Sequence, residues 1–146
     1  MASPSVSIIV PLFNKEEWVT QTLLSVYNQS YRDWECIIVN DGSTDNSLTK
    51  VSKFIEDHPA NWQVITLANS GQTLARNFGI QLAKADLIAF LDADDLWHPK
   101  KLQVQVDLFK NNPELDLSLC TYAIFREKPV SALENIQNHL LGRASD

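Results

Sequence analysis

Short apolar runs alternate with amphipathic stretches of helical period along most of the chain, and this alternation restricts the fold more than any other feature. The apolar runs predict strands over residues 6–13, 34–40, 62–67, 87–91 and 115–125. The amphipathic stretches predict helices over residues 15–28, 43–57, 73–83 and 99–110. Strands with continuous apolar centres are typical of parallel sheets covered on both faces. The pattern therefore predicts an α/β protein with a Rossmann-like, open, mostly parallel sheet and helices on both faces.

The length of 146 residues is enough for one domain with a substantial core. We expect that domain over residues 1–126, followed by a short amphipathic helical tail over residues 127–146. No apolar run approaches the ~18–20 residues that span a bilayer, and the amino end lacks the features of a signal peptide. These observations predict a cytoplasmic protein without a membrane span.

The formal net charge of −6, with no basic stripe, argues against a nucleic-acid partner. Hydrophobic residues make up 45% of the chain, which is too many for a disordered protein. Cys36 and Cys120 lie far apart within apolar runs, so we expect two buried, reduced thiols.

Three acids follow the predicted strand at residues 87–91: Asp92, Asp94 and Asp95. Residues i and i+2 of an extended chain point the same way, so Asp92 and Asp94 are expected to present two carboxylates to one side. Two carboxylates aimed at one point repel each other unless a cation lies between them. Oxygen ligands suit a hard divalent ion, Mg²⁺ or Mn²⁺. The alternative is that these acids cap the next helix and face water.

Polar clusters follow four of the predicted strands, at residues 11–14, 41–43, 69–76 and 92–95. Since the carboxyl ends of parallel strands share one edge, the clusters should meet around one crevice. Asp41 could accept a hydrogen bond from a uracil imide or a ribose hydroxyl, or start an Asx-turn. Arg76 could hold a diphosphate at a helix amino end, or form a surface ion pair.

Three further expectations concern side chains near these clusters. Ser43 or Thr44 is expected to cap the helix that runs to about residue 57. Trp97 is expected to be half-buried, and His98 to cap the helix that follows it.

The four clusters resemble successive motifs of family-two glycosyltransferases with the GT-A fold. The matching segments are Pro11–Asn14, Val39–Asp45, Asn69–Gly71 with Ala75–Ile80, and Leu91–Asp95. The resemblance runs from about Val6 to Phe125. It implies that residues 1–126 are the nucleotide-sugar-binding half of this fold, an incomplete domain without the acceptor half.

The resemblance also implies a nucleoside-diphosphate sugar as ligand, expected to be a UDP-sugar, and Mn²⁺ or Mg²⁺ as cofactor. The implied nucleotide-binding residues are Pro11, Phe13, Asn14, Asp41, Arg76, Asp92 and Ala93. Among these, Asp41 would contact the base, and the Phe13 backbone and Asn14 would border the nucleoside. Asp92 and Asp94 would be the metal ligands, with Asp92 also toward the ribose.

Members of this family invert the anomeric carbon in one displacement, with an Asp or Glu as base on the acceptor hydroxyl. That base lies well downstream of the Asp-x-Asp pair, so we expect it beyond residue 146, with the segments that hold a saccharide or lipid-linked acceptor. Glu134 and His139 match no family motif. A second copy of the chain is a further partner to consider.

Two alternatives remain at this point. The chain could be a nucleotide-binding module without turnover, because it is truncated. It could also be an unrelated doubly wound protein, such as a phosphoryl-transfer or receiver domain, whose acids bind magnesium. No Gly-x-x-x-x-Gly-Lys loop is present, and that alternative would leave Arg76 and the Asp41 cluster unexplained.

Overall fold

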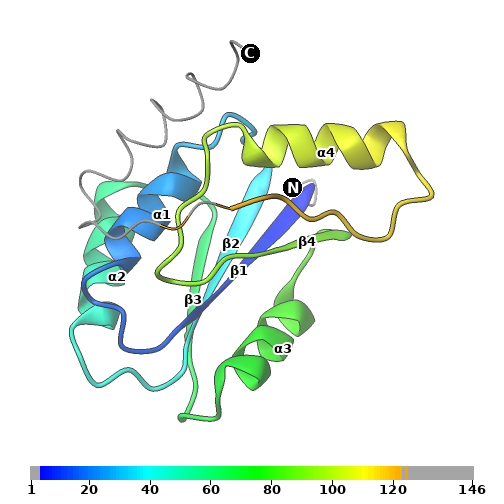
Figure 1. Cartoon of the computed structure of the whole chain (residues 1–146). Helices are drawn as coiled ribbons and strands as arrows, with labels where there is room; N and C mark the ends of the chain where they lie inside the picture. The colour runs from blue at the N-terminus through cyan, green and yellow to red at the C-terminus, as the bar shows by residue number, and fades with distance from the viewer. Residues whose placement is uncertain (1–3, 123, 125–146) are drawn as a thin grey trace.

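The computed structural model describes residues 4–122 and 124, which contain one parallel sheet flanked by helices (Figure 1). The strands are β1 (Val6–Leu12), β2 (Trp34–Asn40), β3 (Trp62–Thr66) and β4 (Leu87–Phe90). The helices are α1 (Val19–Tyr27), α2 (Ser47–Asp57), α3 (Gln72–Leu82) and α4 (Lys101–Asn111). All four strands are parallel, in the order β3-β2-β1-β4. The predicted α/β class with a parallel sheet is confirmed.

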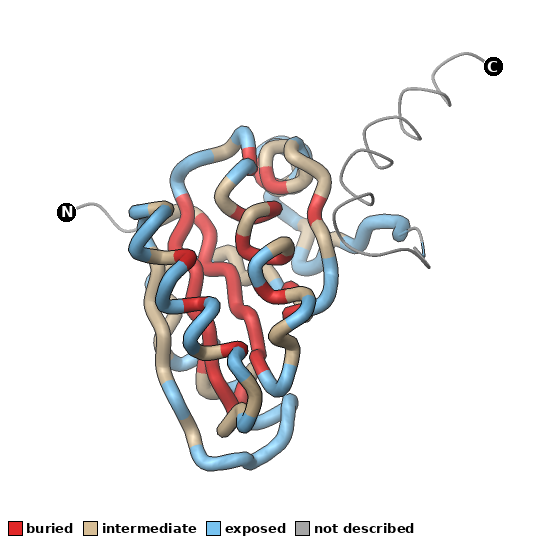
Figure 2. The backbone as a smooth tube through the Cα atoms, turned by 90° about the vertical axis from the view of Figure 1, so that its left-hand side faces the viewer, coloured by how far each residue is buried: buried red, intermediate tan, exposed pale blue. Residues whose placement is uncertain are grey.

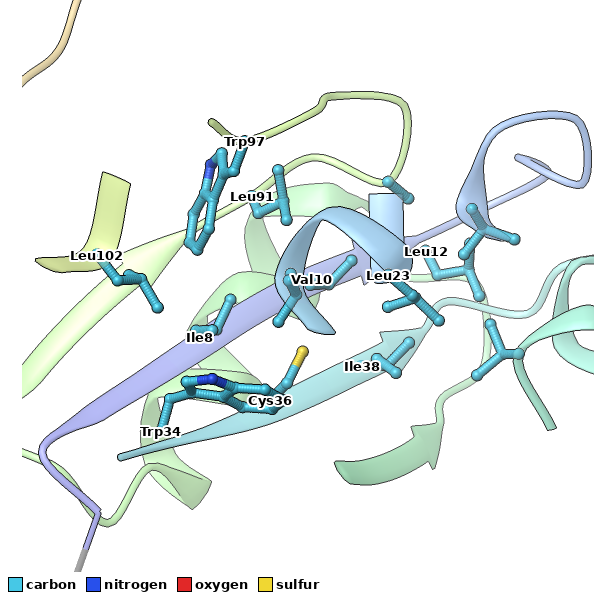
Figure 3. Close-up of a cluster of buried hydrophobic side chains, with 14 of the residues drawn as sticks. Ile8, Val10, Leu12, Leu23, Trp34, Cys36, Ile38, Leu91, Trp97 and Leu102 are labelled. Atoms are coloured by element: carbon cyan, nitrogen blue, oxygen red, sulfur yellow. The ribbon is translucent and has the colours of Figure 1, made fainter. Parts of the chain in front are cut away.

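Helices cover both faces of this sheet. On one face, buried side chains of β1 and β2, such as Ile8, Val10 and Ile38, pack against α1, α2 and α4 (Figure 3). On the other face, Ile37 and Val39 pack against α3. Every residue of β1 and β2 is buried because both of their faces are covered, whereas β3 and β4 are partly exposed (Figure 2).

Gly79 lets α3 approach the sheet closely. A Cβ atom at this position would lie 2.5 Å from Cγ2 of Ile9, a side chain that is fully buried in β1. Helix α3 therefore lies where only a glycine fits against the central strand. At the amino ends of the strands, the buried carboxylate of Glu35 accepts hydrogen bonds from Ser7 Oγ at 2.7 Å and from the Lys84 backbone at 2.8 Å. These contacts anchor the carboxyl end of α3 at that end of the sheet.

The strand order reverses at β1. The chain proceeds outward from β1 to β2 and β3, and then returns to place β4 on the other side of β1. In open α/β sheets, ligands bind beyond the carboxyl ends of the strands at such a switch point. The loops that follow β1 and β4, at residues 13–18 and 91–100, flank it.

The fifth strand that we predicted over residues 115–125 is wrong for the described residues 115–122 and 124, which form neither strand nor helix. Leu117, Leu119 and Tyr122 are exposed, and strand propensity without a neighbouring strand and a covered face does not make a strand. Cys120 is also exposed, which corrects the expectation of a buried thiol. Cys36 is buried as predicted, and its burial, with the nearby charge of Glu35, raises the pKa of its thiol.

Three further expectations concern the carboxyl-terminal tail, Trp97 and His98. The tail predicted over residues 127–146 lies outside the described residues. Trp97 is buried rather than half-buried, and Lys101 Nζ lies 4.1 Å from the centroid of its ring. His98 Nδ1 accepts a hydrogen bond from the Lys100 backbone at 3.2 Å in the turn that leads into α4. The N-cap position of α4 is Lys100, and no described side chain caps the helix, so the expected His98 cap is wrong. In the described part of the chain, no helix is long and apolar enough to cross a membrane.

Candidate functional site

The loop that follows β1 is tied to the loop that follows β2. Asn14 adopts a left-handed backbone conformation (φ 49°), which Asn tolerates better than most residues. Its side-chain oxygen accepts a hydrogen bond from the Thr44 backbone at 2.8 Å, and its own N–H donates to Ser43 Oγ. The next backbone N–H, of Lys15, donates to Ser47 Oγ at 2.8 Å. Ser43 therefore joins two loops instead of capping α2, and neither it nor Thr44 is the cap that we expected.

Asp41 joins the end of β2 to the start of α3. Its carboxylate is nearly inaccessible, with 3% of the residue exposed. One oxygen accepts from the Ser70 backbone at 2.7 Å and from Ser70 Oγ at 3.0 Å, and the other accepts from the Gly71 backbone at 2.8 Å. Asp41 therefore bonds to residues about thirty positions away instead of forming the Asx-turn that was its alternative. The neighbouring Asn40 side chain makes a local contact, because its oxygen accepts from the Ser43 backbone three residues on.

The pKa of Asp41 reflects these contacts. Burial alone would raise it, but the hydrogen bonds from Ser70 and Gly71 favour the charged form and lower it below its ordinary value. Asp41 is thus an ionised acceptor that fixes the loop leading into α3, the helix that carries Gln72 and Arg76.

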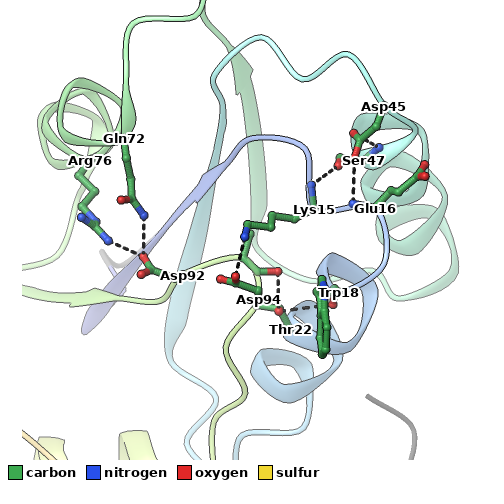
Figure 4. A network of polar contacts seen from close by, with 11 residues as sticks. Lys15, Glu16, Trp18, Thr22, Asp45, Ser47, Gln72, Arg76, Asp92 and Asp94 are labelled. Carbon is green, nitrogen blue, oxygen red and sulfur yellow. Dashed lines mark hydrogen bonds and ion pairs between the residues drawn. The ribbon is translucent and has the colours of Figure 1, made fainter. Parts of the chain in front are cut away.

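The acids after β4 are held by cations from different elements (Figure 4). Arg76 of α3 forms an ion pair with Asp92, which also accepts from Gln72 Nε2 at 3.2 Å. Lys15, from the loop after β1, places its Nζ 2.6 Å from Asp94 Oδ2. Residues 92–95 form a turn instead of continuing the strand, so the two carboxylates contact different partners.

The turn itself is held by two hydrogen bonds. Thr22 Oγ1 of α1 donates to the Ala93 carbonyl at 2.9 Å, and the Asp95 backbone donates to the Asp92 carbonyl at 2.9 Å. Burial raises the pKa of the Asp95 carboxyl, and the charges of Asp92 and Asp94 raise it further, while Lys15 opposes them. Asp95 therefore lies close enough to Asp92 and Asp94 for their charges to disfavour its own.

This arrangement suits a divalent cation that brings further ligands with it. Within residues 4–122 and 124, no group of three or more His, Cys, Asp or Glu side chains could hold a metal ion. The two carboxylates of Asp92 and Asp94 are 38% and 39% exposed and supply hard oxygen donors. Mg²⁺ and Mn²⁺ sites of this kind are typically completed by water and phosphate oxygens. Beside them, the buried Nε of Arg76 has no hydrogen-bond partner among the described residues, so one donor of this guanidinium is unpaired.

The other predicted residues lie around the same edge. Phe13 is exposed, whereas Pro11 and Ala93 are buried. Sequence reasoning missed Lys15 and Gln72, which contact the acid pair directly. The position of Lys15 immediately after Asn14, at the carboxyl end of the first strand, was the available signal, but a single lysine carries no distinctive pattern.

Comparison with known proteins identifies the family. The model of glycosyl transferase family 2 matches residues 7–142, so the chain belongs to this family. A curated relative, the UDP-Glc:alpha-D-GlcNAc-diphosphoundecaprenol beta-1,3-glucosyltransferase WfgD of Escherichia coli, is 37% identical over 111 residues. That match covers 73% of this chain and 42% of WfgD. The matches to three further curated relatives, all glycosyltransferases by name, cover 15% to 45% of the length of those relatives.

Solved structures show the same fold. S. aureus TarS 1–349 in complex with UDP-GlcNAc matches with a TM-score of 0.71 and 26% identity, over 84% of this chain and 38% of that one. The mannosyltransferase PcManGT from Pyrobaculum calidifontis, in complex with GDP-Man and Mn²⁺, matches with a TM-score of 0.69 and 28% identity, over 75% of this chain and 33% of that one. The predicted family, GT-A fold and enzyme class are confirmed, which excludes the unrelated doubly wound protein.

Asp41→Asn should lower the free energy of unfolding at neutral pH by about 1–3 kcal/mol, because an amide NH₂ cannot accept the bonds from Ser70 and Gly71. Since the folded pKa of Asp41 is below its ordinary value, its stabilisation is fully present above about pH 4. It is lost as the pH falls through the folded pKa. Urea unfolding from neutral to acidic pH measures the difference between the two chains.

The matched control is Asp86→Asn, at an exposed position before β4, which should change stability by less than about 0.5 kcal/mol. A difference between wild type and Asp41→Asn that does not shrink in acid would contradict the role of the ionised carboxylate.

Proposed function

We propose that this chain binds a nucleoside-diphosphate sugar, together with Mn²⁺ or Mg²⁺, beyond the carboxyl ends of β1, β2 and β4, for inverting transfer of the sugar to an acceptor hydroxyl. One observation carries the proposal: two carboxylates and two cations from separate elements meet at the switch point, as the pairs Asp92 with Arg76 and Asp94 with Lys15. A metal–diphosphate unit carries both signs of charge and complements such a site.

In this proposal Asp92 and Asp94 hold the metal, and Asp92 also faces the ribose. The bound ion supplies positive charge that stabilises the departing nucleoside diphosphate. Arg76 holds the nucleotide through its guanidinium, whose unpaired Nε supports this role. The backbone of Pro11, Phe13 and Ala93 and the side chain of Asn14 border the nucleoside.

Asp41 contacts the base in this proposal. A carboxylate has about four acceptor sites, and the hydrogen bonds from Ser70 and Gly71 use three of them, which leaves one for a base N–H. The complex of TarS with UDP-GlcNAc and the name of WfgD support a UDP-sugar, whereas PcManGT was solved with GDP-Man. The Mn²⁺ of the last structure supports the divalent cation.

The acceptor side stays a prediction. We propose a saccharide or lipid-linked acceptor, and the diphosphoundecaprenol in the name of WfgD supports the second of these. The catalytic base is unassigned. The domain limits at residues 126 and 127, the cytoplasmic location and self-association also remain predictions. Nucleotide-sugar binding without multiple-turnover transfer would favour the alternative of a binding module.

Removal of the metal should weaken nucleotide binding. Because the ion and the diphosphate each supply charge that the other needs, chelation should lower the affinity for UDP by about fivefold or more, within the usual range of coupling between sites. Asp94→Asn should weaken both Mn²⁺ and UDP, whereas Asp107→Asn, on the exposed side of α4, should leave both unchanged. Isothermal titration with and without Mn²⁺ is the measurement. Equal UDP affinity under both conditions would contradict the metal bridge.

UDP should bind more tightly than CDP in the presence of Mn²⁺, by about tenfold. The uracil N3–H can donate to the remaining acceptor site of Asp41. The cytosine N3 has no proton and is itself an acceptor, so in CDP it would face the Asp41 carboxylate without a hydrogen bond. The two ligands are matched in size, sugar and diphosphate. Competition titration measures the ratio, and equal affinities would remove the base-reading role from Asp41.

A further inference from the structure

Hydrogen bonds hold the backbone around Lys15, whereas the Lys15 side chain is partly exposed and can exchange partners. Its backbone N–H donates to Ser47 Oγ, and the flanking Asn14 and Glu16 are bonded to the loop before α2. The side chain crosses the switch point to Asp94, and both partners of this ion pair are 39% exposed. A lysine side chain has a flexible four-carbon stem and a compact ammonium group. Lys15 is therefore a tethered cation with an exposed end.

We propose that Lys15 is a built-in counter-ion that occupies Asp94 until metal and diphosphate arrive together, and then moves its ammonium group onto the diphosphate. This inference rests on the proposed function, and it assigns to that site a residue that the family motifs did not suggest.

Lys15 and a metal ion would compete for one carboxylate. Lys15 Nζ lies 2.6 Å from Oδ2 of Asp94, one of the two oxygens that this side chain offers to a metal ion. The ammonium group therefore weakens the binding of metal alone, through competition for Oδ2 and through like-charge repulsion.

The net charge of the site favours joint binding of metal and diphosphate. By formal charge, the three acids Asp92, Asp94 and Asp95 exceed the two cations Arg76 and Lys15 by one negative charge. A divalent cation alone reverses that excess, and a diphosphate alone increases it. The diphosphate of a nucleotide sugar carries two negative charges, so a divalent cation and this diphosphate together leave the net charge of the site unchanged. The site is therefore electrostatically suited to the metal–diphosphate unit rather than to either component.

The released ammonium group of Lys15 would lie close to the proposed diphosphate. Lys15 follows β1, the strand next to β4 at the switch point, so its stem begins at the crevice in which the diphosphate is proposed to bind. Arg76 stands on the opposite side, paired with Asp92. Once freed, Lys15 would supply a charge-assisted hydrogen bond to a phosphate oxygen.

Lys15→Met tests this role, because methionine keeps most of the stem and removes the charge. Without the competing ammonium group, Mn²⁺ alone should bind about two- to fivefold more tightly, since an exposed ion pair contributes little. UDP in the presence of saturating Mn²⁺ should bind about tenfold more weakly, because a charge-assisted bond is lost. The two affinities thus change in opposite directions.

Lys15→Arg keeps the charge and should stay within about twofold of wild type for Mn²⁺ alone, a difference within the range of an exposed ion pair. Lys53→Met removes the same charge from the exposed side of α2 and should leave both affinities unchanged. Electron paramagnetic resonance of free Mn²⁺ and calorimetry with UDP measure the two affinities without any transfer reaction. A thermal melt of each variant confirms that it is folded.

Binding by the wild-type chain separates the proposed function from the role of Lys15. If the wild-type chain binds neither Mn²⁺ nor UDP, both the proposed function and the role of Lys15 are overturned. If wild type binds both, but Lys15→Met binds Mn²⁺ alone no more tightly or binds UDP with unchanged affinity, only the role of Lys15 is overturned.

Discussion

Repulsion among the carboxylates of Asp92, Asp94 and Asp95 is the constraint on which this edge of the molecule depends. Cations beside three acids within four positions relieve that repulsion, and the fold supplies two from different directions. Arg76 comes from the helix on one face of the sheet, and Lys15 comes from the loop after β1. The reversal of strand order at β1 brings these elements together. The same charges that stabilise the ligand-free edge define what it can bind.

The loops around the acids are held by hydrogen bonds that leave little freedom in their backbones. Asn14 and Ser43 join the loops after β1 and β2, and Asp41 joins β2 to the start of α3. Thr22 fixes the turn after β4 through the Ala93 carbonyl. A site built this way is pre-organised in its backbone, so ligand binding requires exchange of side-chain partners rather than rearrangement of loops.

The sheet and the place of the site were predictable from sequence because they follow from local patterns. Continuous apolar runs identified β1 to β4, and the rule that parallel strands end at one edge placed Asp41, Arg76 and Asp92 at that edge. Partners distant in sequence were not predictable. Nothing local indicates that Lys15 meets Asp94, since a loop lysine ordinarily faces water. The run at residues 115–125 was misread as a strand because its propensity is local, whereas a strand also requires a neighbour.

Joint binding of metal and nucleotide at the switch point between β1 and β4 is tested most directly by paramagnetic broadening of backbone amide signals. A small fraction of Mn²⁺ is added in the presence of UDP. We expect the strongest broadening at residues 14–15 and 92–95, and the weakest at Glu35 and Lys84, at the opposite end of the sheet. Broadening centred away from the loops after β1 and β4, or none at all, would contradict it.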